Sequence, residues 1–165
     1  MLHISGCGEA RFAGKVLPCT LGRGGTGAKQ REGDGVTPAG QWSILGGLHI
    51  RPDRMERPRT ALAVHPITPW CGWCDAPDDP NYNRYVVAPY GASHETLWRD
   101  DHAYDILIPL SFNTNPVRQG AGSAIFLHLL KPGNATTEGC VAFAIQDMAW
   151  LAQALRPDTP VRITP

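Results

Sequence analysis

The chain has 165 residues, of which 42% are hydrophobic and 18% charged, and its fifteen acidic residues balance its fifteen Lys and Arg. This length predicts one domain, residues 1–165, whose core is large enough to fold without disulfides or a structural metal. The composition excludes a disordered chain, and the balanced charge gives no basic surface for nucleic acid. Eighteen Gly and fifteen Pro indicate many turns between short strands, so we expect a mostly β fold.

The N-terminal segment, Met1 to Gly8, lacks the basic and apolar regions typical of a secretory signal. No stretch approaches the roughly 20 apolar residues that a membrane span requires. Five cysteines, an odd number, also suit a reducing compartment. We therefore expect a cytoplasmic protein with no membrane span, or a periplasmic or cell-wall protein if a leader has been removed.

The first part of the chain alternates short apolar runs with turn residues. Residues 21–27 are rich in glycine but lack the Gly-Lys-Ser/Thr ending of a phosphate loop, which favours a flexible turn. Paired glycines, Gly46 and Gly47, predict a bend or bulge within one of the strands. Strands are expected over residues 1–5, 15–21, 42–50 and 60–67.

Residues 69–101 show no regular periodicity and are rich in aromatic and charged side chains. A long irregular segment in a compact domain is usually functional, although a surface excursion held down by its aromatics would also explain them. We expect most of the aromatics to pack, with Trp73 and Tyr82 as candidate substrate contacts. Arg84 and Arg99 are the candidate carboxylate ligands, because a guanidinium binds a carboxylate through two parallel hydrogen bonds.

The same segment contains Cys71-Gly72-Trp73-Cys74. A redox motif of this spacing should open a helix after a strand, whereas the prolines on both sides favour a loop. Zinc would need two more ligands; His65 and His94 are conceivable, but no second closely spaced pair exists. We interpret the two cysteines as incidental loop thiols and expect neither a metal nor a cofactor.

The last part of the chain contains the clearest periodicities. Apolar residues from Ile145 to Leu155 recur at helical spacing, with Asp147 in the first turn and Pro157 just beyond the end. This predicts a helix over about 145–155. Strands are expected over residues 104–111, 122–130 and 139–143, followed by a closing edge strand over 161–164.

His128 lies near the end of one apolar run, and Cys140 begins the next, twelve residues later. A thiol is a modest nucleophile at its ordinary pKa of about 8.5, and a neighbouring imidazole converts it to the thiolate. Gly139 permits an unusual backbone conformation and exposes amides to a developing oxyanion. A buried cysteine and a core histidine are the alternative interpretation.

If the two residues form a catalytic pair, Cys140 should be alkylated selectively near neutral pH. The sequence leaves open whether a backbone carbonyl or a polar side chain orients the ring of His128.

The stretch His128…Thr137-Glu138-Gly139-Cys140-Val141, with Thr37-Pro38-Ala39-Gly40-Gln41-Trp42 upstream, resembles the YkuD-type L,D-transpeptidase catalytic domain. The resemblance covers nearly the whole chain and implies a β-sandwich-like domain with one main helix. It makes Cys140 the nucleophile, His128 the general base and the amides around Gly139 the oxyanion hole, with Thr137 and Glu138 beside the substrate. Many members have His at the position of Glu138 and Arg at that of Ala142, so the chain resembles a divergent branch.

The resemblance implies acyl transfer on a peptidoglycan stem peptide, with the thiolate attacking the bond between the L-centre of a diamino acid and D-Ala. We expect an L,D-carboxypeptidase of murein recycling, since nothing in the sequence would carry the protein to the wall. One alternative is an L,D-transpeptidase that forms cross-links. Another, suggested by Glu138 and Ala142, is a non-catalytic module that binds wall peptides.

Overall fold

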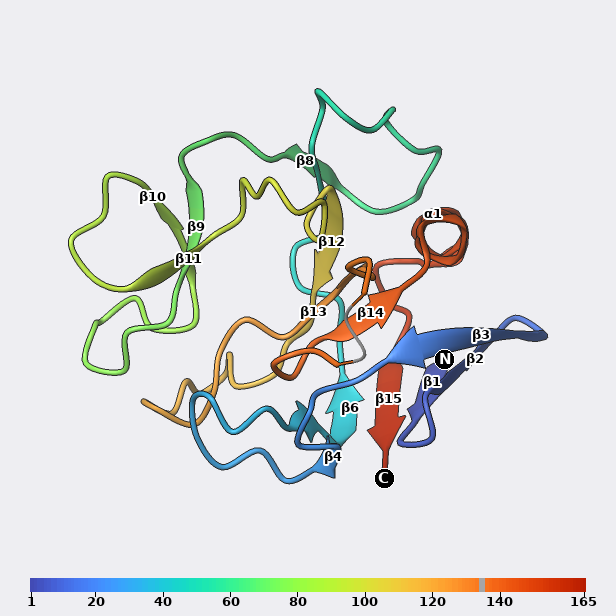
Figure 1. The fold of residues 1–165 in the computed structure, drawn as a ribbon, viewed down its shortest axis with the longest axis horizontal. Helices are drawn as coiled ribbons and strands as arrows, with labels where there is room; N and C mark the ends of the chain where they lie inside the picture. The colour runs from blue at the N-terminus through green and yellow to red at the C-terminus, as the bar shows by residue number, and fades with distance from the viewer. Residues whose placement is uncertain (134–135) are drawn as a thin grey trace.

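In the computed structural model, which describes residues 1–133 and 136–165, a ten-stranded sheet is accompanied by a three-stranded and a two-stranded sheet (Figure 1). The large sheet runs, in spatial order, through β6 (Gly40–Trp42), β15 (Val161–Thr164), β1 (Leu2–Ser5), β2 (Glu9–Phe12), β3 (Lys15–Thr20), β14 (Val141–Phe143), β13 (Phe126–Leu129), β12 (Ile106–Pro109), β7 (Leu48–Ile50) and β8 (Val64–Pro66). The three-stranded sheet is β10 (Tyr85–Val87), β9 (Cys71–Cys74) and β11 (His94–Thr96). The two-stranded sheet pairs β4 (Thr26–Gly27) with β5 (Thr37–Pro38).

One α-helix, α1 (Ile145–Ala154), is found in the described residues, close to the predicted range. It buries Met148, Leu151 and Ala152 in the main apolar core, together with side chains of the large sheet. Asp147 lies in its first turn, where a negative charge interacts favourably with the helix dipole. The mostly β class and the single predicted helix near the C-terminus are thus confirmed.

A second apolar core joins the three-stranded sheet to the central strands of the large sheet. Its aromatic rings pack edge to face, Trp73 against Phe126 at 5.2 Å and Tyr104 against Phe126 at 5.7 Å between centroids. Cys140 belongs to this core, at its border. The three-stranded sheet (the small sheet below) lies on the far side of the central strands from α1 in Figure 1. It therefore packs behind the region around the candidate nucleophile.

The prediction of an irregular segment over residues 69–101 is wrong, because β9, β10 and β11 lie within it. Cys71 and Cys74 are buried in β9 and are not loop thiols. Because the two cysteines are three residues apart on a strand, their side chains point to opposite faces of the sheet. Both are free thiols.

Other boundaries also differ from the sequence-based expectations. β15 is not an edge strand, because β1 pairs with it in parallel on one side and β6 antiparallel on the other. The strand expected over residues 42–50 is two strands, β6 and β7, with Gly46 and Gly47 between them at φ +75° and +121°. β2 was not predicted, and β8 covers only part of the range 60–67.

Candidate active site

Cys140 lies immediately before β14 and is 9% exposed. Its thiol donates to the carbonyl oxygen of Ala124 at 3.1 Å and accepts the N–H of Phe126 at 3.3 Å. Gly139 before it has φ +130°, and a Cβ there would lie 2.9 Å from the carbonyl oxygen of Val36. Glycine at this position is therefore required by both its backbone conformation and the close packing of the neighbouring loop.

His128 lies on β13 with 7% of its surface exposed. Its Nδ1 is 2.8 Å from the carbonyl oxygen of Leu129. A carbonyl only accepts, so Nδ1 carries the proton and Nε2 is the basic nitrogen. A backbone carbonyl thus fixes the tautomer, and the edge-to-face ring of Tyr104 at 5.3 Å restricts the ring's rotation.

The register of two parallel strands sets the relation between the candidate nucleophile and base. His128 on β13 pairs with Ala142 on β14, so Cys140 lies two positions earlier along the ladder, about 6.6 Å in the strand direction. Positions two apart point to the same face. Both residues line one cavity of about 460 Å³, although no hydrogen bond joins their side chains in the part of the chain that the structure describes.

Burial controls the protonation of both groups. It raises the pKa of the Cys140 thiol to about 12, assisted by the negative charge of Glu95 and opposed by the Phe126 N–H and by Lys29 and Arg99. Burial also lowers the pKa of His128 to about 4. At neutral pH the resting pair is a neutral thiol and a neutral imidazole, in contrast to the preformed thiolate expected from the sequence.

One wall of the cavity is built from interlocked charged groups. Tyr104 donates its hydroxyl to Glu95, whose pKa is raised, chiefly by burial. The guanidinium of Arg99 lies 4.9 Å from the centroid of the Tyr104 ring and donates from Nε to Asp101 at 2.9 Å. Lys131 reaches the same Asp101 at 3.1 Å. Arg99 therefore already holds a carboxylate, and a substrate carboxylate would have to share it.

Three of the sequence-predicted substrate residues, Thr137, Glu138 and Arg99, line this cavity. Thr137 donates its hydroxyl to the carbonyl of Cys140 at 2.7 Å and accepts the N–H of Gly139 at 3.2 Å. The Gly139 amide is thus engaged within its own loop. Glu138 pairs with Arg23 at 3.0 Å, and both side chains are exposed.

The other three predicted contacts lie elsewhere. Arg84 and Trp73 line a separate cavity of about 650 Å³. Tyr82 is buried, donates to Glu32 and accepts the N–H of Gly122 at 2.9 Å. Packing of the small sheet against β13 explains these positions, and no sequence signal indicated which side chains of this segment would face Cys140.

Sequence reasoning missed other groups that line the cavity, namely Lys29, Glu32, Asp75, Glu95 and Tyr104. They come from four separate parts of the chain, which only the tertiary fold brings together. Among the described residues, no group of three or more His, Cys, Asp or Glu is arranged to hold a metal ion. Nor does this part of the chain contain a helix with the length and apolarity of a membrane span.

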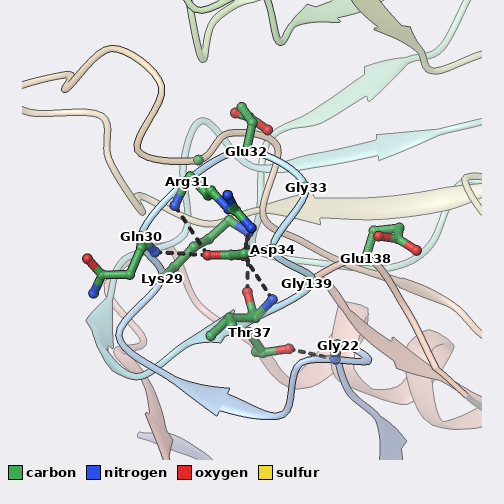
Figure 2. A network of polar contacts seen from close by, with 12 residues as sticks. Gly22, Lys29, Gln30, Arg31, Glu32, Gly33, Asp34, Thr37, Glu138 and Gly139 are labelled. Carbon is green, nitrogen blue, oxygen red and sulfur yellow. Dashed lines mark hydrogen bonds and ion pairs between the residues drawn. The ribbon is translucent and has the colours of Figure 1, made fainter.

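The Thr37-Pro38 motif binds a backbone segment that packs against the loop carrying Cys140. Thr37 is fully buried and accepts the N–H of Gly22 at 2.8 Å (Figure 2). A Cβ on Gly22 would lie 2.0 Å from the carbonyl oxygen of Gly35 and 3.0 Å from Cα of Gly139. Gly22, Gly35 and Gly139 thus let the backbone around residues 22 and 35 approach the loop that carries Cys140.

Comparison with protein-family models identifies the family of this chain. The family model for YkuD, the L,D-transpeptidase catalytic domain, matches residues 11–163. Among solved structures, Mycobacterium tuberculosis L,D-transpeptidase 1 is similar at 11% sequence identity and a TM-score of 0.46, with all of this chain and 61% of that chain covered. No curated protein matches the sequence. With a family match over almost its whole length, and with Cys140 and His128 on one cavity, the chain belongs to the YkuD family of L,D-transpeptidase catalytic domains.

Proposed function

We propose that the protein is a cysteine acyl-transfer enzyme acting on peptidoglycan stem peptides, with Cys140 as nucleophile and His128 as general base. One observation carries the proposal: the Cys140 thiol and the His128 ring line the same cavity, and the basic nitrogen of His128 is Nε2. The absence of a hydrogen bond between the two side chains at rest is compatible with this role, since catalytic hydrogen bonds often form or tighten only when substrate binds.

In this mechanism, His128 Nε2 takes the thiol proton as the sulfur attacks the carbonyl carbon of the bond that joins the diamino acid's L-centre to D-Ala. The C=O electron pair moves to oxygen, and the amide of Cys140, which has no hydrogen-bond partner among residues 1–133 and 136–165, faces the oxyanion. Collapse breaks the C–N bond, and His128 returns the proton to the leaving D-Ala amine. A thioester on Cys140 remains.

We further propose that water resolves this thioester, which makes the protein an L,D-carboxypeptidase of murein recycling in the cytoplasm. The cysteines favour this choice over cross-linking. All five are free thiols, including the exposed Cys7, and free thiols persist in a reducing compartment. A reducing compartment would offer soluble peptides released from the wall as substrates, and these suit hydrolysis. A transpeptidase that forms wall cross-links is therefore the second candidate.

The products of the purified protein on disaccharide tetrapeptide test both proposals. Tripeptide and free D-Ala are expected by mass spectrometry, whereas dimers or exchanged D-amino acids would indicate transfer to an amine. Cys140→Ala should lower turnover on the order of 10⁴-fold or more, as in comparable nucleophile knockouts, and its circular dichroism should match the wild type. Binding of tetrapeptide without any turnover would instead indicate a wall-peptide binding module.

A further inference from the structure

Lys29 is a buried cation beside the candidate nucleophile. Its side chain is 2% exposed, and its ammonium lies 2.6 Å from Asp34. A Cβ on Gly139 would lie 3.5 Å from Lys29 Nζ. The side chain lines the cavity that contains Cys140 and His128, whereas Asp34 does not. The positive end of the pair therefore faces the cavity.

Backbone groups of its own loop also hold the Asp34 carboxylate in place. The Asp34 carboxylate accepts backbone N–H groups of Gln30 at 2.9 Å, Arg31 at 3.2 Å and Val36 at 3.0 Å, and Figure 2 shows it enclosed by this loop. Together with Lys29, these bonds hold the pKa of Asp34 well below its usual range. Asp34 would keep three charge-assisted partners without the lysine.

The ammonium has donor capacity to spare. Of its three N–H groups, one donates to Asp34 and one points to the carbonyl oxygen of Val36 at 3.4 Å, a weak contact. No third acceptor is found for it in the described part of the chain. At the same time the Gly139 N–H is occupied by Thr137, so one amide expected to face the oxyanion is missing.

We propose that the Lys29 ammonium stabilises the negative charge that develops on the Cys140 sulfur as its proton leaves during acyl transfer. This inference rests on the proposed function, but the charge it stabilises also forms when the free thiol ionises. Four other titratable groups share the cavity with Cys140, namely Glu95 on β11, Arg99 after it, Tyr104 before β12 and His128 on β13. Of these, Glu95 disfavours the thiolate and Arg99 favours it. Both cations that stabilise the thiolate are ion-paired, Lys29 with Asp34 and Arg99 with Asp101, and Lys29 is the one that lies beside Gly139.

Alkylation of Cys140 tests the inference without any peptide substrate. At a pH well below the thiol pKa, the rate with iodoacetamide is proportional to the thiolate fraction, so one unit of pKa changes it about ten-fold. Lys29→Gln removes the charge and keeps N–H donors for Asp34. We expect alkylation of Cys140 at pH 8, followed by peptide mass spectrometry, to slow about ten-fold or more. A purely structural role would loosen the buried site and make the same reaction faster.

Lys131→Gln is the matched control, because Lys131 lines the same cavity but pairs with Asp101 at its rim. Its alkylation rate should stay within about two-fold of the wild type, and so should that of Lys29→Arg, which keeps the charge. An unchanged or faster rate in Lys29→Gln overturns the inference. If that variant does not fold, a ten-fold slower rate in folded Lys29→Arg overturns it instead. Failure to turn over tetrapeptide would refute the proposed function alone and leave the alkylation result unaffected.

Discussion

The thiol of Cys140 donates a hydrogen bond to the backbone carbonyl of Ala124, at 3.1 Å, and not to the ring of His128. The candidate nucleophile is thus a hydrogen-bonded neutral thiol in a buried site. His128 is equally buried and neutral, held by the carbonyl of Leu129. In the proposed mechanism, proton transfer between them accompanies attack on the substrate, because neither group carries its charge at rest.

The pH dependence of turnover should reflect this arrangement. Burial lowers the pKa of His128 to about 4, so the ring stays neutral and able to act as base until the pH falls through that value. An ordinary histidine, with a pKa of about 6.5, would be about nine-tenths protonated at pH 5.5 and its activity would drop about ten-fold. We therefore expect kcat/KM on tetrapeptide at pH 5.5 to remain within about two-fold of its value at pH 7.5.

The measurement is a pH series of initial rates, with circular dichroism at each pH to show that the protein is folded. A ten-fold loss between pH 7.5 and 5.5 with the fold intact would mean that the base titrates normally, and would contradict a buried neutral imidazole.

Asn83 should be a key determinant of stability. Its Oδ1 accepts Trp73 Nε1–H at 2.9 Å and the N–H of Ala124 at 3.0 Å, and its Nδ2 donates to the carbonyls of Phe112 at 2.9 Å and Asn113 at 2.8 Å. All four bonds are lost in Asn83→Ala, which leaves buried groups unsatisfied. We expect the free energy of unfolding to fall by roughly 3–5 kcal/mol.

Urea denaturation of Asn83→Ala measures this loss, with Asn81→Ala as the control. Asn81 is exposed, and its side chain bonds only to the hydroxyl of Tyr90 among the described residues. Its substitution should change the free energy of unfolding by about 0.5 kcal/mol or less. Equal effects of the two variants would show that the four bonds contribute nothing specific.

Gly22 should tolerate no side chain. A Cβ there would meet the carbonyl oxygen of Gly35 at 2.0 Å, and backbone cannot rotate away as a flexible side chain can. Gly22→Ala should therefore lower the free energy of unfolding by about 2 kcal/mol or more, and displace the Gly139 loop. Both the unfolding temperature and the rate of tetrapeptide turnover should therefore fall.

Gly27→Ala is the comparison, since nothing lies within 4 Å of a Cβ at Gly27 and its φ is not in the left-handed region. Its unfolding temperature should match or slightly exceed that of the wild type, because alanine restricts the unfolded chain. A Gly22→Ala protein as stable and active as Gly27→Ala would refute the close approach of the two loops.

The sequence by itself determined the parts that depend on local pattern. Helical spacing located α1 to within a residue, because one face of the helix is buried. Apolar runs over 122–130 and 139–143 indicated β13 and β14, which are buried on both faces and are shorter than those runs. Two short motifs identified the family, since a glycine before a nucleophilic cysteine meets a local backbone requirement. The sheet β9–β10–β11 was missed because its strands are short and lie among prolines and polar turns.

Only the tertiary structure decided what surrounds Cys140. Lys29, Glu95 and Tyr104 are separated by long stretches of chain, and no local pattern shows that they share a cavity. The protonation of Cys140 and His128 was equally hidden, because a pKa depends on burial and on charges from distant segments. Arg84 and Arg99 looked alike in the sequence, and the packing of the small sheet against β13 placed only Arg99 beside the nucleophile.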